Sequence, residues 1–124
     1  MNAQLTSNET HLDPSLTLRN VRWDDLDAVT KLIYDVCEAD GDATVATSAD
    51  DLKNWWETDG FDISTDAFVV ETQDGKIVGY EEIADENVHA DLQADGYVHP
   101  QFKGLGVGTA LLRAAETRAR EHLA

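Results

Sequence analysis

The chain has 124 residues, 42% of them hydrophobic, which suffices for one compact domain and for no second one of normal size. Nine Lys and Arg against 25 Asp and Glu give a formal net charge of −16, so we expect no nucleic-acid and no membrane partner. The pattern predicts neither a secretory signal peptide nor an apolar run of the roughly 20 residues that span a bilayer, and we expect a cytoplasmic protein.

The acidic side chains are mostly aspartates, with 16 Asp and 9 Glu, and only four residues are Lys. This composition suits a protein that stays hydrated at high salt, where charge repulsion is screened. Two interpretations remain open: a salt-adapted source, or an ordinary acidic protein. The single cysteine, Cys37, leaves no intramolecular disulfide and no cysteine metal cluster, and we predict no metal site.

The beginning of the chain predicts a leader, a strand and a helix. Residues 1–15 are polar and without apolar periodicity, so we expect a disordered leader. Apolar and polar residues alternate over 16–21, as in a strand. Asp24 is the expected N-cap of the following helix, whose apolar residues recur at helical spacing up to about Gly41.

A second helix is expected to begin after Ser48, whose hydroxyl can cap it, and to end by Gly60. Its apolar face carries Leu52, Trp55 and Trp56. Of the two adjacent tryptophans, we expect one in the core and the other partly exposed.

The second half predicts a hairpin, a strand and a helix. The hairpin consists of strands at 67–72 and 77–83 around a turn that contains Asp74-Gly75. A further strand is expected over 88–98 and a helix over 105–123. Core-facing positions on that helix are Leu111, Leu112, Ala115 and Ala119, and outward ones are Arg113, Glu116, Arg118 and Arg120. The element order β-α-α-β-β-β-α predicts an α+β fold in α/β/α layers, with a mostly antiparallel sheet.

The most informative segment runs from Val98 to Leu112 and reads VHPQFKGLGVGTALL. Glycines alternate at 104, 106 and 108 between the end of a strand and the start of a helix, where a backbone without Cβ atoms can approach a ligand. The first turn of the helix adds unpaired N–H groups and the positive end of its dipole. This arrangement predicts a cradle for a diphosphate, with Lys103 as a nearby positive charge. The dinucleotide and Walker patterns do not match.

With these residues the sequence resembles the GCN5-related N-acetyltransferase (GNAT) superfamily. The motif A of that family, [Arg/Gln]-x-x-Gly-x-[Gly/Ala], matches Lys103 to Gly108, with Lys where Arg or Gln is usual. A literal match also begins at Gln101, but the first register keeps Val98-x-Pro100 and Ala110-Leu111-Leu112 in their usual places.

The resemblance extends over residues 16–121, so that a GNAT-like domain is expected over 16–124. The stretch Gly60 to Ile63 is similar to the N-terminal halves of tandem acetyltransferases of the mycothiol-synthase-like group. A complete family member would continue past Ala124 with a strand, a helix and two more strands. The resemblance therefore leaves three alternatives: a piece of a longer tandem protein, a short protein completed by a partner or a second copy at the open edge of the 88–98 strand, or a remnant.

The resemblance implies acetyl-CoA as co-substrate and a small-molecule or peptide amine as acceptor, within a partial acyl-CoA N-acyltransferase fold. It implies direct attack by the amine in a ternary complex, with the amide of Val98 or His99 holding the developing oxyanion. The pantetheine arm would lie near Tyr97, Val98 and His99. The residues implied to hold the diphosphate are Lys103, Gly104, Leu105, Gly106, Val107, Gly108 and Thr109.

The acceptor must also lose a proton, and several groups are candidates for the base. The resemblance implies a carboxylate on the 88–98 strand, and Asp91 matches that position best, on one face with Asp95. Glu81 and Glu82 on the preceding strand are alternatives, as is the imidazole of His99. For the whole chain, the alternative function is a non-catalytic module that binds CoA or mediates protein association.

Overall fold

The computed structural model describes residues 12–42, 44, 46–59, 61–83 and 95–123. The strands are β1 (Leu16–Asn20), β2 (Ala67–Thr72), β3 (Ile77–Glu82) and β4 (Asp95–Val98). The α-helices are α2 (Leu26–Ala39), α3 (Ala49–Trp56), α4 (Ile63–Asp66) and α5 (Val107–Leu123). Two 3₁₀ turns, η1 (Trp23–Asp25) and η4 (Pro100–Phe102), complete the described elements.

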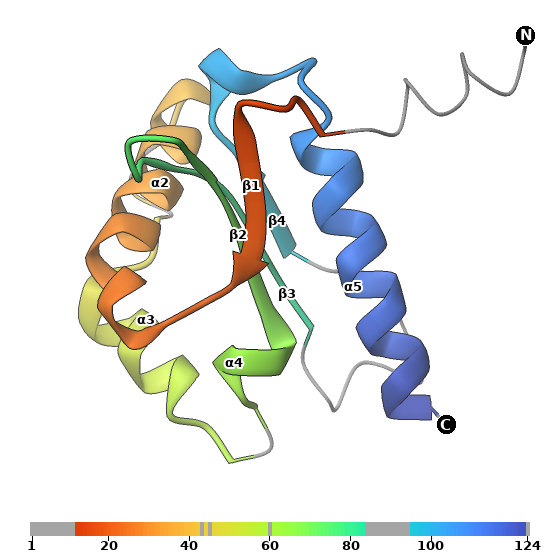
Figure 1. Ribbon diagram of the computed structural model, residues 1–124. Helices are drawn as coiled ribbons and strands as arrows, with labels where there is room; N and C mark the ends of the chain where they lie inside the picture. The colour runs from red at the N-terminus through yellow and green to blue at the C-terminus, as the bar shows by residue number, and fades with distance from the viewer. Residues whose placement is uncertain (1–11, 43, 45, 60, 84–94, 124) are drawn as a thin grey trace, which may run out of the picture.

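The four strands form one antiparallel sheet in the order β1-β2-β3-β4. Helices α2 and α3 cover one face of this sheet and α5 covers the other (Figure 1). The predicted α+β architecture in α/β/α layers is therefore confirmed.

A separate apolar core fills each interface between sheet and helices. The core under α2 and α3 contains the largest buried side chains, among them Trp56 and Tyr80, and the indole N–H of Trp56 donates to the Tyr80 hydroxyl at 3.1 Å. Trp55 is only partly buried, as expected for one of the two tryptophans. The core under α5 is smaller and consists of Leu16, Val70, Val78, Val107 and Leu111.

Several local predictions are confirmed. The Ser48 hydroxyl accepts from the amide of Asp51 at 3.1 Å and so caps α3. The hairpin of β2 and β3 lies where it was expected. The strand predicted over 88–98 is described from Asp95 onward, and its earlier residues lie outside the described part.

Other local predictions are wrong. Asp24 does not cap the first long helix, because the 3₁₀ turn η1 intervenes and α2 begins only at Leu26. Leu112 on α5 is 49% exposed, whereas Leu111, Ala115 and Ala119 are buried. The single turns α4 and η4 were not predicted.

The expected leader is described from Leu12 onward. Leu12 packs against the core under α5, and the amide of Asp13 donates to the carbonyl of Leu105 at 2.8 Å. These contacts join the segment before β1 to the loop before α5. Among the described residues, no helix is both long and apolar enough to cross a membrane.

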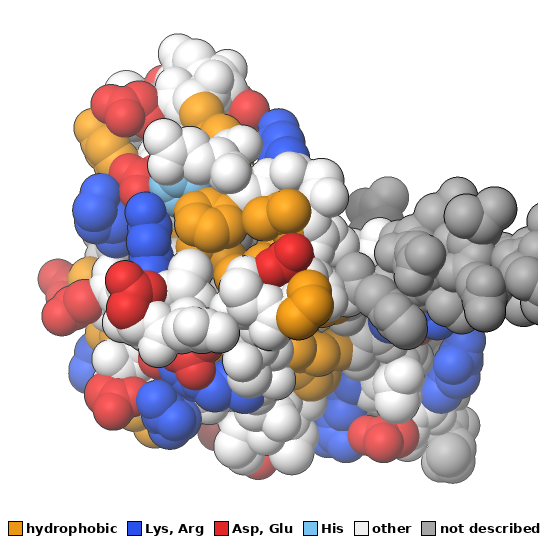
Figure 2. Space-filling model, turned by 45° about the horizontal axis from the view of Figure 1, so that its top comes forward, with side chains coloured by type: hydrophobic (Ala, Val, Ile, Leu, Met, Phe, Trp, Pro, Cys, Tyr) orange, Lys and Arg blue, Asp and Glu red, His pale blue; other side chains and the backbone are white. Residues whose placement is uncertain are grey.

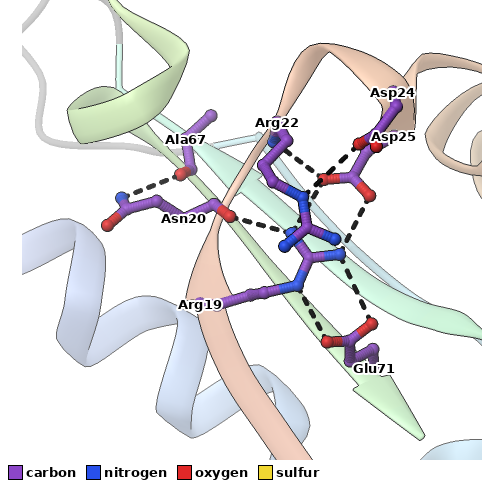
Figure 3. Close-up of polar contacts among 7 residues, drawn as sticks. All are labelled: Arg19, Asn20, Arg22, Asp24, Asp25, Ala67 and Glu71. Carbon is purple, nitrogen blue, oxygen red and sulfur yellow. Dashed lines mark hydrogen bonds and ion pairs between the residues drawn. The ribbon is translucent and has the colours of Figure 1, made fainter. Parts of the chain in front are cut away.

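An arginine on β1 joins the edge of the sheet to the entry of α2 (Figure 3). The Arg19 guanidinium donates to both Asp25 carboxylate oxygens, at 2.8 and 2.9 Å, and to Glu71 on β2 at 2.8 Å. Asp25 also accepts from the amide of Arg22 at 2.8 Å. Burial alone would raise the pKa of Asp25, but the hydrogen bonds from Arg19 and the Arg22 amide outweigh it and place that pKa below its ordinary value.

Asp25→Asn is expected to lower the free energy of unfolding by about 2 kcal/mol at pH 7, because charge-assisted hydrogen bonds are lost. A carboxylate with a lowered folded-state pKa stabilises the fold above its unfolded pKa of about 3.9, and this contribution disappears as the pH falls through the folded value. Urea unfolding from pH 7 down to pH 2 should therefore show the difference between the two proteins shrinking. Asp24→Asn, at an exposed neighbour, is the control, and an equal loss there would contradict the assignment.

Candidate functional site

The segment between β4 and α5 lies at one end of the sheet and leads over it to the start of α5 (Figure 1). Pro100 begins the 3₁₀ turn η4, where a residue without an N–H fits. The Nδ1 atom of His99 accepts from the amide of Gln101 at 3.1 Å, and the His99 carbonyl accepts from the amide of Phe102 at 2.9 Å. The histidine thus holds the turn that leads into the glycine loop.

Two glycines of the loop have backbone angles that favour this residue type. Gly104 has φ +84° and Gly106 has φ +83°, in the left-handed region. A Cβ at Gly104 would meet no heavy atom within 4 Å, so this side of the loop is open. Gly108 differs, because it lies in the first turn of α5 without a positive φ.

The backbone amides of this loop are available to a ligand. The carbonyl of Gly106 accepts from the amide of Ala110 at 2.9 Å, and α5 proceeds from there. Within the described part of the chain, no oxygen accepts from the amides of residues 103–109. Since the first amides of a helix have no partner inside it, they form a local site for negative charge.

Most residues of this loop line an open hollow of about 390 Å³. Its lining consists of Val98, Phe102, Lys103, Gly104, Gly106, Val107, Gly108 and Thr109. Figure 2 shows this end of the molecule, where hydrophobic side chains gather in the middle of the face and Lys and Arg side chains lie beside them. The Nζ atom of Lys76, on the hairpin turn, lies 5.8 Å from the centre of the Phe102 ring. Lys103 and Lys76 thus bring positive charge to this hollow in an acidic chain.

Comparisons with known proteins relate this part of the chain to acetyltransferases. The family described as "Acetyltransferase (GNAT) domain" matches residues 64–124, which include β4, the glycine loop and α5. This part of the chain belongs to the GNAT superfamily. None of the curated proteins compared with it matches.

Solved GNAT structures share the fold of this chain. A GCN5-related N-acetyltransferase from Sphaerobacter thermophilus is 31% identical, with a TM-score of 0.76 over 91% of this chain and 35% of that one. The protein yncA from Salmonella typhimurium, solved with its cofactor acetyl-CoA, is 21% identical with a TM-score of 0.63 over 87% of this chain and 65% of its own. A phosphinothricin acetyltransferase from Sinorhizobium meliloti, in complex with acetyl-CoA, is 22% identical with a TM-score of 0.60 over 86% of this chain and 60% of its own. The chain thus spans about a third to two thirds of the length of these proteins.

Of the two amides expected to hold an oxyanion in this GNAT domain, one is already used inside the sheet. The amide of His99 donates to the carbonyl of Val78 on β3 at 2.9 Å. Because successive amides of a strand point to opposite sides, the amide of Val98 points away from β3, toward the open edge of the described sheet. Of the two amides, that of Val98 therefore remains the candidate.

The imidazole of His99 lies on the side of the sheet that α2 covers. Its Nε2 atom is 3.9 Å from a carboxylate oxygen of Asp35 on α2, and its ring contacts Phe102 edge-on. Burial, followed by the positive charge of Lys76, places the pKa of His99 below its ordinary value of 6.5. The ring is therefore neutral at pH 7, and Nδ1 already accepts the Gln101 amide.

Of the carboxylates that are candidates for the base, some lie outside the described residues and two lie on β3. Asp91, the expected base, lies outside the described residues, as does the side chain of Asp95. Glu81 is buried, with 5% of its surface exposed, and precedes Glu82 on β3. Glu82 accepts from the Tyr80 hydroxyl at 2.7 Å and from the indole N–H of Trp55.

Glu82 also lines a second hollow, of about 210 Å³, that the sequence did not predict. The other lining residues are Ile33, Thr47, Leu52, Trp55 and Tyr97. This hollow lies on the α2 and α3 face of the sheet, whereas the glycine loop lies at the start of α5. Tyr97 and Val98, adjacent on β4, line the two hollows on opposite faces. In the described part of the chain, no cluster of His, Cys, Asp and Glu could hold a metal ion.

Proposed function

We propose that this chain binds acetyl-CoA at the glycine loop and acts in the acetyl-CoA-dependent transfer of an acetyl group to a primary amine. The observation that supports this proposal best is that the amides of residues 103–109 have no acceptor among the described residues and that most of these residues line an open hollow. A diphosphate fits such a donor set, because it carries negative charge and accepts several hydrogen bonds at once. The GNAT relatives solved with acetyl-CoA support the same ligand.

Each part of the site has a role in this mechanism. The amides of Gly104 to Thr109 would hold the diphosphate, and Lys103 would add a positive charge. When bound, acetyl-CoA supplies an acetyl group in the form of a thioester. The amide of Val98 would donate to the carbonyl oxygen of this thioester and stabilise its negative charge as the amine attacks. Tyr97 and Val98 would flank the pantetheine arm along the edge of β4.

A carboxylate would take the proton that the amine loses as the new C–N bond forms, while the C–S bond breaks and CoA leaves as its thiolate. Asp91 remains our prediction for this role on the family resemblance. Glu82 is the alternative that the described residues favour, because it faces a hollow next to Tyr97. The neutral imidazole of His99 is a positioning group in this proposal, since it holds the turn η4.

The tandem, mycothiol-synthase-like arrangement also stays a prediction. It is supported by the Sphaerobacter thermophilus protein, of which this chain covers 35%. A second half, whether on the same chain, on a partner or on a second copy, could add a strand beside β4, the last strand of the described sheet.

Calorimetric titration of the chain with acetyl-CoA tests the proposal. We expect a saturable heat and a rise in melting temperature, because a ligand at 100 times its Kd stabilises the folded state by about 2.7 kcal/mol. Acetate and free adenosine are the controls, since neither carries a diphosphate. No heat and no melting shift at millimolar acetyl-CoA would favour the alternative, a module for protein association.

A further inference from the structure

We infer that the hollow between α2, α3 and the ends of β3 and β4 binds the acceptor, and that this acceptor is a small primary amine on an apolar or aromatic group. This inference rests on the proposed function, because it assigns the second substrate of the same reaction. The hollow is lined by Ile33, Thr47, Leu52, Trp55, Glu82 and Tyr97.

The first argument is position. Tyr97 lines this hollow on the α2 and α3 face, and Val98, the next residue of β4, lines the hollow at the glycine loop on the other face. Between them, the amide of Val98 points to the open edge of the described sheet. A carbonyl oxygen held by that amide would thus lie one residue from the aromatic wall of the second hollow.

The second argument is charge. The Tyr80 hydroxyl, at 2.7 Å, and the Trp55 indole N–H both donate to Glu82 and hold its carboxylate in place. Burial, followed by the negative charge of Glu82, places the pKa of Tyr80 well above its ordinary value, so the phenol stays protonated and keeps donating. A carboxylate attracts an ammonium group by charge, and an ammonium group can donate up to three hydrogen bonds. A fixed carboxylate inside a hollow therefore favours a cation over an anion.

The third argument is the shape and character of the walls. Apart from Glu82 and Thr47, the lining consists of aliphatic and aromatic side chains. The indole of Trp55 and the phenol of Tyr97 can attract a cation as well as apolar atoms. A volume of about 210 Å³ lies below the ~300–1,000 Å³ of pockets for drug-sized ligands. A small amine, or the end of a longer chain, fits this space better than a bulky molecule.

The experiment measures amine binding without acetyl-CoA. The full chain, labelled with ¹⁵N, is titrated with 2-phenylethylamine while the indole N–H signals of its tryptophans are followed by NMR. We expect a saturable shift of the Trp55 signal, which Trp55→Phe identifies by removing it. The neutral analogue 2-phenylethanol and the anionic 3-phenylpropionate should bind at least tenfold more weakly. Equal binding of the alcohol and the amine would overturn the inference.

Variants separate recognition from folding. Glu82→Gln should weaken amine binding at least tenfold, because its amide oxygen can still accept from Trp55 and Tyr80 while the charge is gone. Glu57→Gln makes the same change at an exposed site at the end of α3 and should have no effect. Unchanged affinity in Glu82→Gln would contradict the inference. If that variant fails to fold, Thr47→Phe gives a second test: this substitution fills the hollow, so amine binding that survives it is evidence against the assignment.

Separate measurements test acetyl-CoA binding at the glycine loop and amine binding in the hollow at Glu82. Acetyl-CoA binding by calorimetry should be equal in Glu82→Gln and the parent chain, since the glycine loop is untouched. Amine binding without acetyl-CoA binding would overturn the proposed function only. Acetyl-CoA binding without selective amine binding would overturn this inference only.

Discussion

Gly108→Asp should lower the affinity for acetyl-CoA by about 100-fold without destabilising the fold. A carboxylate in the first turn of α5 would lie at the wall of the hollow, close to the charges of a bound diphosphate. Repulsion of about 2–3 kcal/mol at such distances corresponds to roughly 100-fold in Kd. The same carboxylate interacts favourably with the amino end of the helix dipole, by about 0.3–1 kcal/mol. The variant should therefore melt at the same temperature as the parent or slightly above it.

The control for this prediction is Gly108→Ala. A Cβ at Gly108 would have Val98 Cγ2 as its nearest neighbour, at an ordinary 3.7 Å, and the position has no positive φ. Alanine should therefore stabilise α5 while weakening acetyl-CoA binding far less than aspartate does. Gly106 is a poorer site for this test, because its φ of +83° would strain any side chain. Calorimetry that shows equal affinity for all three proteins would remove the diphosphate site from this loop.

Those features of the fold that depend on neighbours in the sequence could be predicted from the sequence. The hairpin follows from two β-rich runs around Asp74-Gly75, and Gly75 has φ +90° in the turn. The Ser48 cap follows from an oxygen that reaches an amide three residues on. The glycine loop is similarly local, since its backbone angles and the helix start depend on residues 104 to 107.

The errors arise where distant residues decide the structure. Asp25 is drawn toward Arg19 on β1, and this ion pair stabilises the 3₁₀ turn that displaces the expected helix start at Asp24. Leu112 keeps helical spacing with the core positions, yet α5 presents Leu111 to the sheet and leaves Leu112 exposed. Arg118, expected to point outward, reaches Asp66 on α4 at 2.7 Å. Periodicity alone does not show which partners a helix face meets.

The candidate site also has one part that depends on neighbouring residues and one that depends on residues far apart in the sequence. The glycine loop, where we propose that the diphosphate binds, is one continuous segment, and its position follows from the spacing of the glycines. The hollow at Glu82 brings together residues of α2, α3, β3 and β4, with Trp55 and Glu82 separated by 27 positions. Its only signals in the sequence were the two adjacent tryptophans and the carboxylates at 81 and 82. The use of the His99 amide in strand pairing, which leaves Val98, depends on the register between β3 and β4.

The glycine on β3 should be the least replaceable residue between the sheet and α5. The register shifts between Val70 and Glu71, so that β3 carries an extra residue at Val78 and Gly79 also turns toward α5. A Cβ on Gly79 would lie 2.6 Å from Val107 Cγ1 and 2.9 Å from Leu111 Cδ1, both on buried residues of α5. At both distances something must shift, either the buried side chains of Val107 and Leu111 or the first turns of the helix that carries them.

Gly79→Val should therefore lower the free energy of unfolding by about 3–4 kcal/mol, at or above the upper end of usual overpacking costs. For a domain of this size, that corresponds to a fall of more than about 10 °C in melting temperature. Because Val107 opens α5 at the glycine loop, the milder Gly79→Ala should also weaken acetyl-CoA binding from a distance. Thermal unfolding and calorimetry on the same samples measure both effects.

A double-mutant cycle identifies the cause of this loss. Val107→Ala removes the methyl group that a Cβ at Gly79 would meet, at its own cost of a buried side chain. If the close contact is responsible, the loss in Gly79→Ala with Val107→Ala is smaller than the sum of the two single losses. If the two single losses in free energy of unfolding simply add, the loss in Gly79→Ala arises in the backbone of β3 instead. Gly108→Ala, where a Cβ has room, should show no comparable loss, so a generic penalty for replacing glycine is tested in the same series.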